Sequence, residues 1–266
     1  MRVIRCKPMR VGLLISMILR SWAWEIPNHL HFNYRVNLFE ASALTTHEEN
    51  LRANVRKTIR KHSKSRPSPT VHFFDDQECA RLIAVAADEE TARYFKEETE
   101  GMYRSDMCRA AGLWRYGGLY FDNDMQTLAS SWDRLRPTAQ FVTVRDFERR
   151  YFFQSFLGSA PKLELMRTYL FGMRAHYRGT HVVHGLLGVQ VLRIAYDAHL
   201  RDPTLADAQL WSEVDNSKTH HLRERLWGWE KLCDYLVVDD GDRPIFWSRM
   251  VGSPKCRDLF ETKIPR

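Results

Sequence analysis

The sequence predicts an α/β fold whose sheet is largely parallel at its start, and three observations predict it. Apolar segments typical of strands alternate with segments of helical periodicity through the first half of the chain. Two acids, Asp122 and Asp124, follow the apolar run "LYF", which is typical of a buried strand. The 266 residues, 44% hydrophobic and 27% charged, have the balance of a folded soluble protein with a sizeable core.

The first elements alternate strand and helix. We expect a strand at 26–34, "IPNHLHFNY", where apolar residues alternate loosely after a proline, and then a helix at 47–62. The loop "SKSRPSP" ends that helix, and a second strand at 70–76 closes on two acids. Helices continue over 77–98.

Residues 105–124 predict a helix, a glycine pair and a strand that ends in two acids. Ser105 is the expected N-cap of a helix over 106–116, and Gly117-Gly118 fits a helix stop because glycine adopts a left-handed conformation without steric cost. The chain then resumes as a strand at 119–121, with Asp122 at its carboxyl end. Ligands of open α/β sheets bind at the carboxyl ends of strands, so this is where we expect the site.

The second half of the chain carries weaker patterns. We expect a strand at 140–146, a strand or loop at 151–161 that leads into a helix at 162–177, and a glycine-marked loop that enters a helix within 183–200. The tail, 234–258, mixes short strands and turns. We find no internal repeat, low-complexity segment or clear linker.

The charge and the N-terminus bear on partners and compartment. A net charge of +7 favours anionic partners, although the basic run 52–66 is better explained as a solvated helix face that runs into a loop than as a polyanion site. Residues 1–24 combine basic residues, the apolar run 11–19 and a small-x-small pattern at 21–23. This favours a secretory signal or a short signal-anchor over a buried first strand or helix.

The five cysteines are scattered, with no CxxC pair. This argues against a cysteine-based structural zinc site and against a disulfide-dense scaffold. One bridge, for example Cys233 to Cys256, would fit an oxidising compartment.

The acid pair requires a neutralising partner. Carboxylates at i and i+2 repel each other unless a cation or a proton intervenes, and their oxygens suit Mn²⁺ or Mg²⁺. A calcium loop would place a glycine and a glutamate where the chain has Thr127 and Asp133. A haloacid-dehalogenase phosphatase would place Thr or Val where Gln126 stands. Both readings are therefore rejected.

The block "SDMCRAAGLWRYGGLYFDND" closely resembles the DXD sugar-binding region of a family of retaining glycosyltransferases. The family includes the initiating α-1,6-mannosyltransferase and the lactosylceramide α-1,4-galactosyltransferase. "IPNHLHFNY" and "VHFFDD" resemble the family's first two strands, in the right order. The resemblance implies a GT-A nucleotide-sugar-binding domain over 25–266, a Rossmann-like mixed sheet flanked by helices.

The resemblance also implies residue roles. Asp122 and Asp124 are the expected metal ligands, with Asp124 bound directly and Asp122 holding the ribose or a metal-bound water. Asp106 and Arg109 share a helix face and are expected to hold the donor sugar, unless they form a surface salt bridge. These four acids and bases are the expected catalytic residues. The expected donor-binding residues are His31, Tyr34, Tyr103, Asp106, Arg109, Gly118, Asp122 and Asn123.

Other positions follow the family pattern less closely. Tyr34 stands where the family generally has a base-stacking Trp, and it also fits a half-buried strand aromatic; His31 also fits a satisfied strand histidine. Arg104 joins Tyr103 as a neighbour of the donor residues, whereas Leu113 and Trp114 are expected in the core. Acceptor-side candidates are Gly185, Gly188, His181 and His184, and "IFWSRMVGS" with Trp247 and Ser248 only faintly resembles the family's closing segment.

These observations predict a metal-dependent retaining glycosyltransferase that moves a hexose from a UDP- or GDP-sugar to a hydroxyl of a glycan or glycolipid. The expected cofactor is Mn²⁺ or Mg²⁺, the expected compartment is the secretory pathway, in particular the Golgi lumen, and membrane association would run through the N-terminus. No nucleic-acid partner is expected. The alternatives are a non-catalytic basic protein that binds polyanions on the same fold and a nucleotide-sugar hydrolase.

Overall fold

A computed structural model describes residues 25–64, 68–145, 151–183, 186–200, 207–215, 235–239, 241 and 243–247. The predicted signal segment, His184, Gly185, Ser248 and the cysteines at 233 and 256 lie outside the described residues. No helix among the described residues has the length and apolar character needed to cross a membrane.

The described strands form one nine-stranded mixed sheet in the order β2-β1-β3-β6-β5-β7-β8-β9-β4. The prediction of a parallel start is confirmed: β1 (His29–Asn33) pairs in parallel with β2 (Thr70–Phe74) on one side and β3 (Gly118–Phe121) on the other. The carboxyl ends of these strands therefore meet at one edge of the sheet.

The rest of the sheet is mostly antiparallel, apart from the parallel pair β5 and β7. The eight-residue strand β7 is one that sequence patterns did not predict. The remaining strands are β4 (Gln126–Thr127), β5 (Phe141–Arg145), β6 (Phe152–Ser159), β7 (Ala208–Asp215), β8 (Tyr235–Val238) and β9 (Pro244–Trp247).

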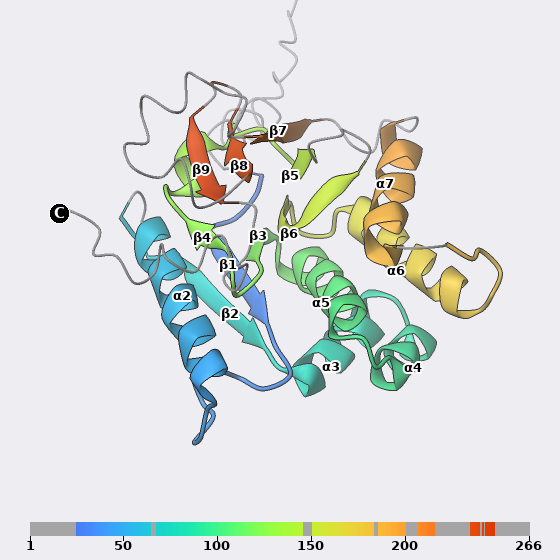
Figure 1. Cartoon of the computed structure of the whole chain (residues 1–266). Coiled ribbons are helices and arrows are strands. Elements are labelled where there is room, and N and C mark those ends of the chain that lie inside the picture. Colours follow the sequence, from blue (N-terminus) through green and yellow to red (C-terminus); the bar gives the residue numbers. More distant parts are fainter. Residues whose placement is uncertain are drawn as a thin grey trace, which may run out of the picture.

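Helices cover both faces of the sheet (Figure 1). The helix α2 (Thr46–His62) packs on one face through Leu51 and Val55. The opposite face is covered by α3 (Asp76–Ala86), α4 (Glu89–Glu97), α5 (Gly101–Tyr116), α6 (Glu164–Tyr177) and α7 (Leu187–Leu200).

The alternation along β1 explains the two-sided core. Leu30 and Phe32 point to the α2 face and are buried, which stabilises the fold by roughly 1.5–3 kcal/mol each. The other side chains of β1, those of His29, His31 and Asn33, point to the α5 face because successive residues of a strand alternate. The same strand face therefore carries two histidines and, at its carboxyl end, an asparagine.

Capping boxes begin the helices that follow β1 and β2. The Thr45 hydroxyl accepts a hydrogen bond from the Glu48 amide while the Glu48 carboxylate accepts one from the Thr45 amide. Asp75 and Glu78 form the same arrangement at α3. The acids that close the predicted strand 70–76 therefore also start the next helix.

The start of α5 differs from the prediction. The helix begins at Gly101, so Ser105 lies in its second turn and is not the N-cap. Its hydroxyl instead donates to the Asn33 side-chain oxygen on β1, at 2.7 Å. The Ser105 hydroxyl, which the local sequence pattern assigned to helix capping, therefore forms a tertiary hydrogen bond instead.

Gly117 and Gly118 end α5 as predicted, with φ of 64° and 108°. The ψ of Gly117 is −175°, an extended region that only glycine readily occupies, and not the left-handed helical conformation that we expected. A Cβ at Gly117 would lie 2.7 Å from Pro161 and 2.8 Å from Pro27. Close packing therefore requires glycine here as much as conformation does.

Candidate active site

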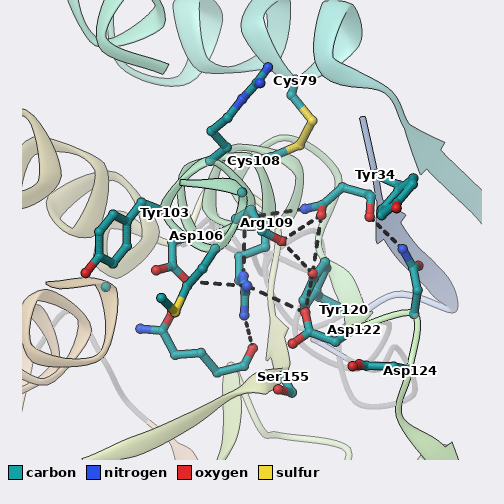
Figure 2. A pocket seen from close by; sticks show the side chains of 18 of the residues that line it. Tyr34, Cys79, Tyr103, Asp106, Cys108, Arg109, Tyr120, Asp122, Asp124 and Ser155 are labelled. Carbon is teal, nitrogen blue, oxygen red and sulfur yellow. Dashed lines mark hydrogen bonds and ion pairs between the residues drawn. A yellow bond between two sulfur atoms is a disulfide. The ribbon is translucent and has the colours of Figure 1, made fainter. Parts of the chain in front are cut away.

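A cavity of about 750 Å³ opens at the carboxyl ends of β1 and β3. The predicted acids Asp106, Asp122 and Asp124 and the base Arg109 all line it (Figure 2). The structure thus brings together, on α5 and after β3, the four side chains that sequence patterns predicted to be catalytic.

Arg109 lies between two of these carboxylates. Its Nη2 atom is 3.3 Å from Oδ1 of Asp106 and 3.5 Å from Oδ1 of Asp122. The residues Asp106 and Arg109 are only 3% and 5% exposed. The alternative of a helix-surface salt bridge is therefore wrong, since this pair is buried in the pocket wall.

Backbone carbonyls and an aromatic ring hold the guanidinium in place. Nε of Arg109 donates to the Ser105 carbonyl at 3.2 Å, and Nη1 donates to the Gln154 carbonyl on β6. The Arg109 guanidinium also lies 4.6 Å from the centre of the Tyr120 ring. With these partners fixed, the charge of Arg109 stays beside the two acids.

Tyr120 connects the strand to the acid at its end. Its hydroxyl donates to Oδ1 of Asp122 at 2.5 Å and lies 3.0 Å from the Ser105 hydroxyl. Because residues i and i+2 of a strand share a face, Tyr120 and Asp122 reach the pocket together. One oxygen of Asp122 is thus oriented by the protein.

Asp106 is held between α5 and α7. Burial raises the pKa of Asp106 to about 7, and Asp122 adds to this, while Arg109 opposes it. Gly188, in the first turn of α7, lies so close that any side chain there would meet the Asp106 carboxylate. The two helices therefore fix the position of this acid.

Asp124 is the acid without a cationic partner among the described residues. Burial, and after it the charge of Asp122, raises the pKa of Asp124 to about 7. Within the described part of the chain, no Lys, Arg or His forms an ion pair with Asp124. Among the described residues, three carboxylates share one guanidinium at this strand end, so their full ionisation leaves two negative charges that none of these residues compensates.

This donor set fits a hard divalent cation. Asp124 is largely desolvated and carries oxygen atoms with no cationic partner among the described residues. Asp122, beside it in Figure 2, keeps one oxygen outside the contacts to Tyr120 and Arg109. Carboxylate oxygens with an excess of two negative charges suit Mn²⁺ or Mg²⁺.

Three predicted donor-binding residues also line the cavity: Tyr34, Tyr103 and Asn123. Tyr34 is half-buried just beyond β1, with its ring near the Arg35 guanidinium, at 5.7 Å. The Asn123 amide donates to the Asn33 carbonyl at 2.8 Å, so it holds the turn after β3 against β1. Its contribution is therefore to the shape of the pocket wall.

Two predicted donor-binding residues lie away from the cavity. His31 is 1% exposed in mid-strand under α5, where its Nε2 pairs with the Gly117 carbonyl at 2.5 Å. Gly118 begins β3, at the opposite end from Asp122, and a Cβ there would lie 2.6 Å from the His29 carbonyl. The structure corrects both assignments because each residue serves packing beneath the sheet edge.

The remaining predicted positions divide between core and surface. Leu113 is buried, as expected, whereas Trp114 is half-buried with the Lys162 ammonium 3.3 Å from its ring centre. Arg104 pairs with Asp76 at 2.6 Å on the cavity wall. His181 is exposed and does not line the cavity, and Trp247 ends β9.

Sequence patterns missed a disulfide beside the site. Cys79 of α3 and Cys108 of α5 form a bridge, with Cα atoms 5.0 Å apart, and both residues line the cavity (Figure 2). The bridge fastens the helix that carries Asp106 and Arg109 to its neighbour. The scattered cysteines gave no signal for it, since their pairing depends on how two helices pack.

The patterns also missed several residues of the pocket wall. Asn33, Ser105 and Gln154 support Arg109 or Asp122 directly or through Tyr120. Tyr120 had a usable signal, since it lies two residues before Asp122 on a strand. Gln154 acts through its backbone carbonyl, a group that every residue has, so its residue type gave no signal.

Residues 48–142 match the family described as "Glycosyltransferase sugar-binding region containing DXD motif". The match covers 95 of the 266 residues of the chain, and these include Asp106, Arg109, Asp122 and Asp124. A solved structure titled "PaToxG Glycosyltransferase" is similar to this chain, with a TM-score of 0.51 and 16% identity over 72% of this chain and 80% of that one. This likeness supports the GT-A fold. No curated protein sequence matches the chain significantly.

Proposed function

We propose that this protein is a metal-dependent, retaining glycosyltransferase that transfers a hexose from a UDP- or GDP-sugar to a hydroxyl of a glycan or glycolipid. The observation that carries the metal dependence is the charge around Asp124. A donor diphosphate is itself doubly negative, so it would be repelled by a strand end with two uncompensated negative charges. Binding of the donor therefore calls for a divalent cation between them.

The side chains of the pocket have separate roles in this proposal. Asp124, with Asp122 beside it, would hold Mn²⁺ or Mg²⁺, which supplies positive charge to stabilise the diphosphate leaving group. Arg109 keeps Asp106 and Asp122 oriented and adds a fixed positive charge to the pocket wall. Asp106 presents oxygens that accept hydrogen bonds from the hydroxyls of the donor sugar.

The nucleotide would lie against Tyr34. This half-buried ring stands at the carboxyl end of β1 and offers an aromatic face to the base. The cavity volume falls within the range of small-molecule sites. Positioning of donor and acceptor, together with stabilisation of the leaving group, would supply most of the rate enhancement.

Retention of configuration and the acceptor class rest on the family resemblance. The secretory pathway, with the Golgi lumen as the proposed compartment, rests on the pattern of residues 1–24. The Cys79–Cys108 bridge supports an oxidising compartment, because disulfides persist there and are rare in the cytosol. Membrane attachment through the N-terminus belongs to the same proposal.

A screen of UDP- and GDP-sugars with and without Mn²⁺ tests the proposed function. We expect one nucleotide class to bind and to be consumed only with the metal, with transfer to an added sugar or glycolipid acceptor and an unchanged anomeric configuration in the product. A nucleotide-sugar hydrolase would release free sugar at the same rate with or without acceptor. A non-catalytic polyanion-binding protein would bind without metal, and its affinity would fall with salt.

A further inference from the structure

Three histidines gather on the α5 face of the sheet, away from the acidic pocket. His29 and His31 lie on β1, and His72 lies on β2, directly opposite His31 in the parallel register. One potential ligand atom from each of the three lies within 4.8 Å of the other two. The rings of His31 and His72 have centres 4.7 Å apart, and those of His29 and His72 are 5.0 Å apart.

Each histidine of this triad has a buried nitrogen without a hydrogen-bond partner. These nitrogens are Nδ1 of His29, Nδ1 of His31 and Nε2 of His72. Buried polar atoms are nearly always paired, since an unpaired one costs roughly 1–3 kcal/mol. Three unpaired nitrogens in one cluster therefore require an explanation, and a bound ion is one.

The tautomer of His31 favours this explanation. Its Nε2 lies 2.5 Å from the Gly117 carbonyl, which can only accept, so Nε2 carries the proton and Nδ1 carries a lone pair. A backbone hydrogen bond to Tyr116 holds His29 in a similar way. Histidines that bind metals typically donate their other ring nitrogen to such a carbonyl, which fixes the ring.

We propose that His29, His31 and His72 form a structural binding site for Zn²⁺ or a similar transition-metal ion. Zinc–nitrogen bonds of about 2.0–2.1 Å imply nitrogen separations of roughly 3.4 Å, so ligand atoms that now lie within 4.8 Å of one another would approach by up to about 1.4 Å. His31 is held by Gly117, whereas His29 and His72 are only partly buried. The rings of His31 and His72 are now stacked at 10°, so the rotation that coordination requires falls on His29 and His72. A water molecule would complete the four-coordinate site.

The ligand chemistry separates this site from the acidic pocket. Imidazole nitrogens suit Zn²⁺, Cu²⁺ or Ni²⁺, whereas carboxylate oxygens suit Mn²⁺ and Mg²⁺. Burial lowers the pKa of His31 to about 3 and that of His72 to about 4, so both rings are neutral at pH 7 and need not lose a proton to bind. The proposal does not depend on the proposed function.

The site would brace the helix that carries the donor residues. His31 bonds the Gly117 carbonyl, at the end of α5, and His29 forms a hydrogen bond with the backbone of Tyr116 on the same helix. A metal bound by the triad would tie β1, β2 and the end of α5 together. Asp106 and Arg109 project from the same helix, so the brace stiffens their support.

Zinc titration of untagged protein tests the proposal by calorimetry and by the melting temperature. We expect one equivalent to bind with a Kd below about 10 µM and to raise the melting temperature. Cobalt(II) should give the visible absorption of a tetrahedral site. A wild-type protein that binds no zinc, or shows no cobalt band, would overturn the proposal without reference to any variant.

Variants then locate the ion. His72→Gln, at a partly buried position, should weaken zinc binding by at least about tenfold, whereas His47→Gln, an exposed histidine of α2, should leave zinc stoichiometry unchanged. Asp124→Asn should bind zinc as the wild type does. Zinc binding that survives His72→Gln but is lost in Asp124→Asn would place the ion at the carboxylates and contradict the triad.

Discussion

Gly188 of α7 lies directly against Asp106 of α5: a Cβ added at Gly188 would stand 1.8 Å from Oδ2 of Asp106 and 2.9 Å from the Tyr169 hydroxyl. Neither the Asp106 carboxylate nor the Tyr169 hydroxyl can easily move away, because each is held by another residue. Arg109 holds Asp106, and Tyr169 donates to the Gln154 side chain at 3.0 Å. The glycine thus keeps α7 close enough to form the wall behind the acid.

Gly188→Ala should therefore displace Asp106 and lower kcat/KM by at least about tenfold, since misplaced site residues cost catalysis steeply. Overpacking should also lower the free energy of unfolding by about 1–3 kcal/mol. Ile194→Ala, on the same helix but 49% exposed, is the matched control and should change neither quantity much. Equal activity in wild type and Gly188→Ala would show that Asp106 need not stay where it is.

Asp124→Asn should remove metal-dependent turnover, with a loss of at least about 100-fold, because Asp124 is the largely desolvated acid without a described cationic partner. The metal-free variant should be at least as stable as the wild type, since one of two repelling charges is gone. Melting temperatures without metal and rates with Mn²⁺ measure the two effects. Asp133→Asn, an exposed acid nearby, is the control; a variant at Asp124 that keeps Mn²⁺-dependent rates would refute the assignment.

Mn²⁺ affinity should depend on pH around 7. The folded-state pKa of Asp124 is raised from 3.8 to about 7, so the metal-free protein binds a proton there that Mn²⁺ must displace. Below pH 7 the apparent Kd should rise about tenfold per pH unit, and above about pH 8 it should level off. The free energy of unfolding depends on pH in the opposite direction from Mn²⁺ affinity. Protonated Asp124 stabilises the metal-free protein most below about pH 4, and this contribution is lost as the pH rises through 7.

Calorimetric titration with Mn²⁺ between pH 5.5 and 8.5 measures this dependence. Asp106→Asn should keep it, because Asp106 also has a raised pKa but is paired with Arg109 and is not an expected ligand. A flat pH profile in the wild type would mean that no protonated carboxylate competes with the metal.

Reduction of Cys79–Cys108 should lower the free energy of unfolding by about 3.5 kcal/mol, the value expected for a loop closed by cysteines 29 positions apart. Urea unfolding with and without a reductant measures it. The double variant Cys79→Ala/Cys108→Ala should match the reduced protein and show no further response to reductant. If reductant destabilises the double variant as much as the wild type, another bridge is responsible.

Short-range patterns were sufficient for the elements that build the site. Gly117-Gly118 and the apolar run before Asp122 marked the end of one helix and the start of β3, since both signals lie within a few residues. Asp106 and Arg109 were predicted to share a helix face, and they do. Whether that face was buried could not be known, because burial depends on α7 and β6.

The errors arose where tertiary contacts override local preference. Ser105 has the chemistry of a cap but bonds Asn33, which lies 72 positions earlier in the chain. Gly118 was assigned to the donor site through the family resemblance, although it begins β3 and therefore lies at the opposite end of that strand from Asp122. The partner of Cys79 was hidden for a related reason, since it lies on another helix.

A crystal structure with Mn²⁺ and the nucleotide selected by the donor screen measures the central relationship most directly. We expect anomalous density for manganese within coordinating distance of an Asp124 oxygen and of the nucleotide's diphosphate, with Arg109 still between Asp106 and Asp122. Manganese bound elsewhere, with the Asp124 carboxylate turned away from the diphosphate, would contradict the account.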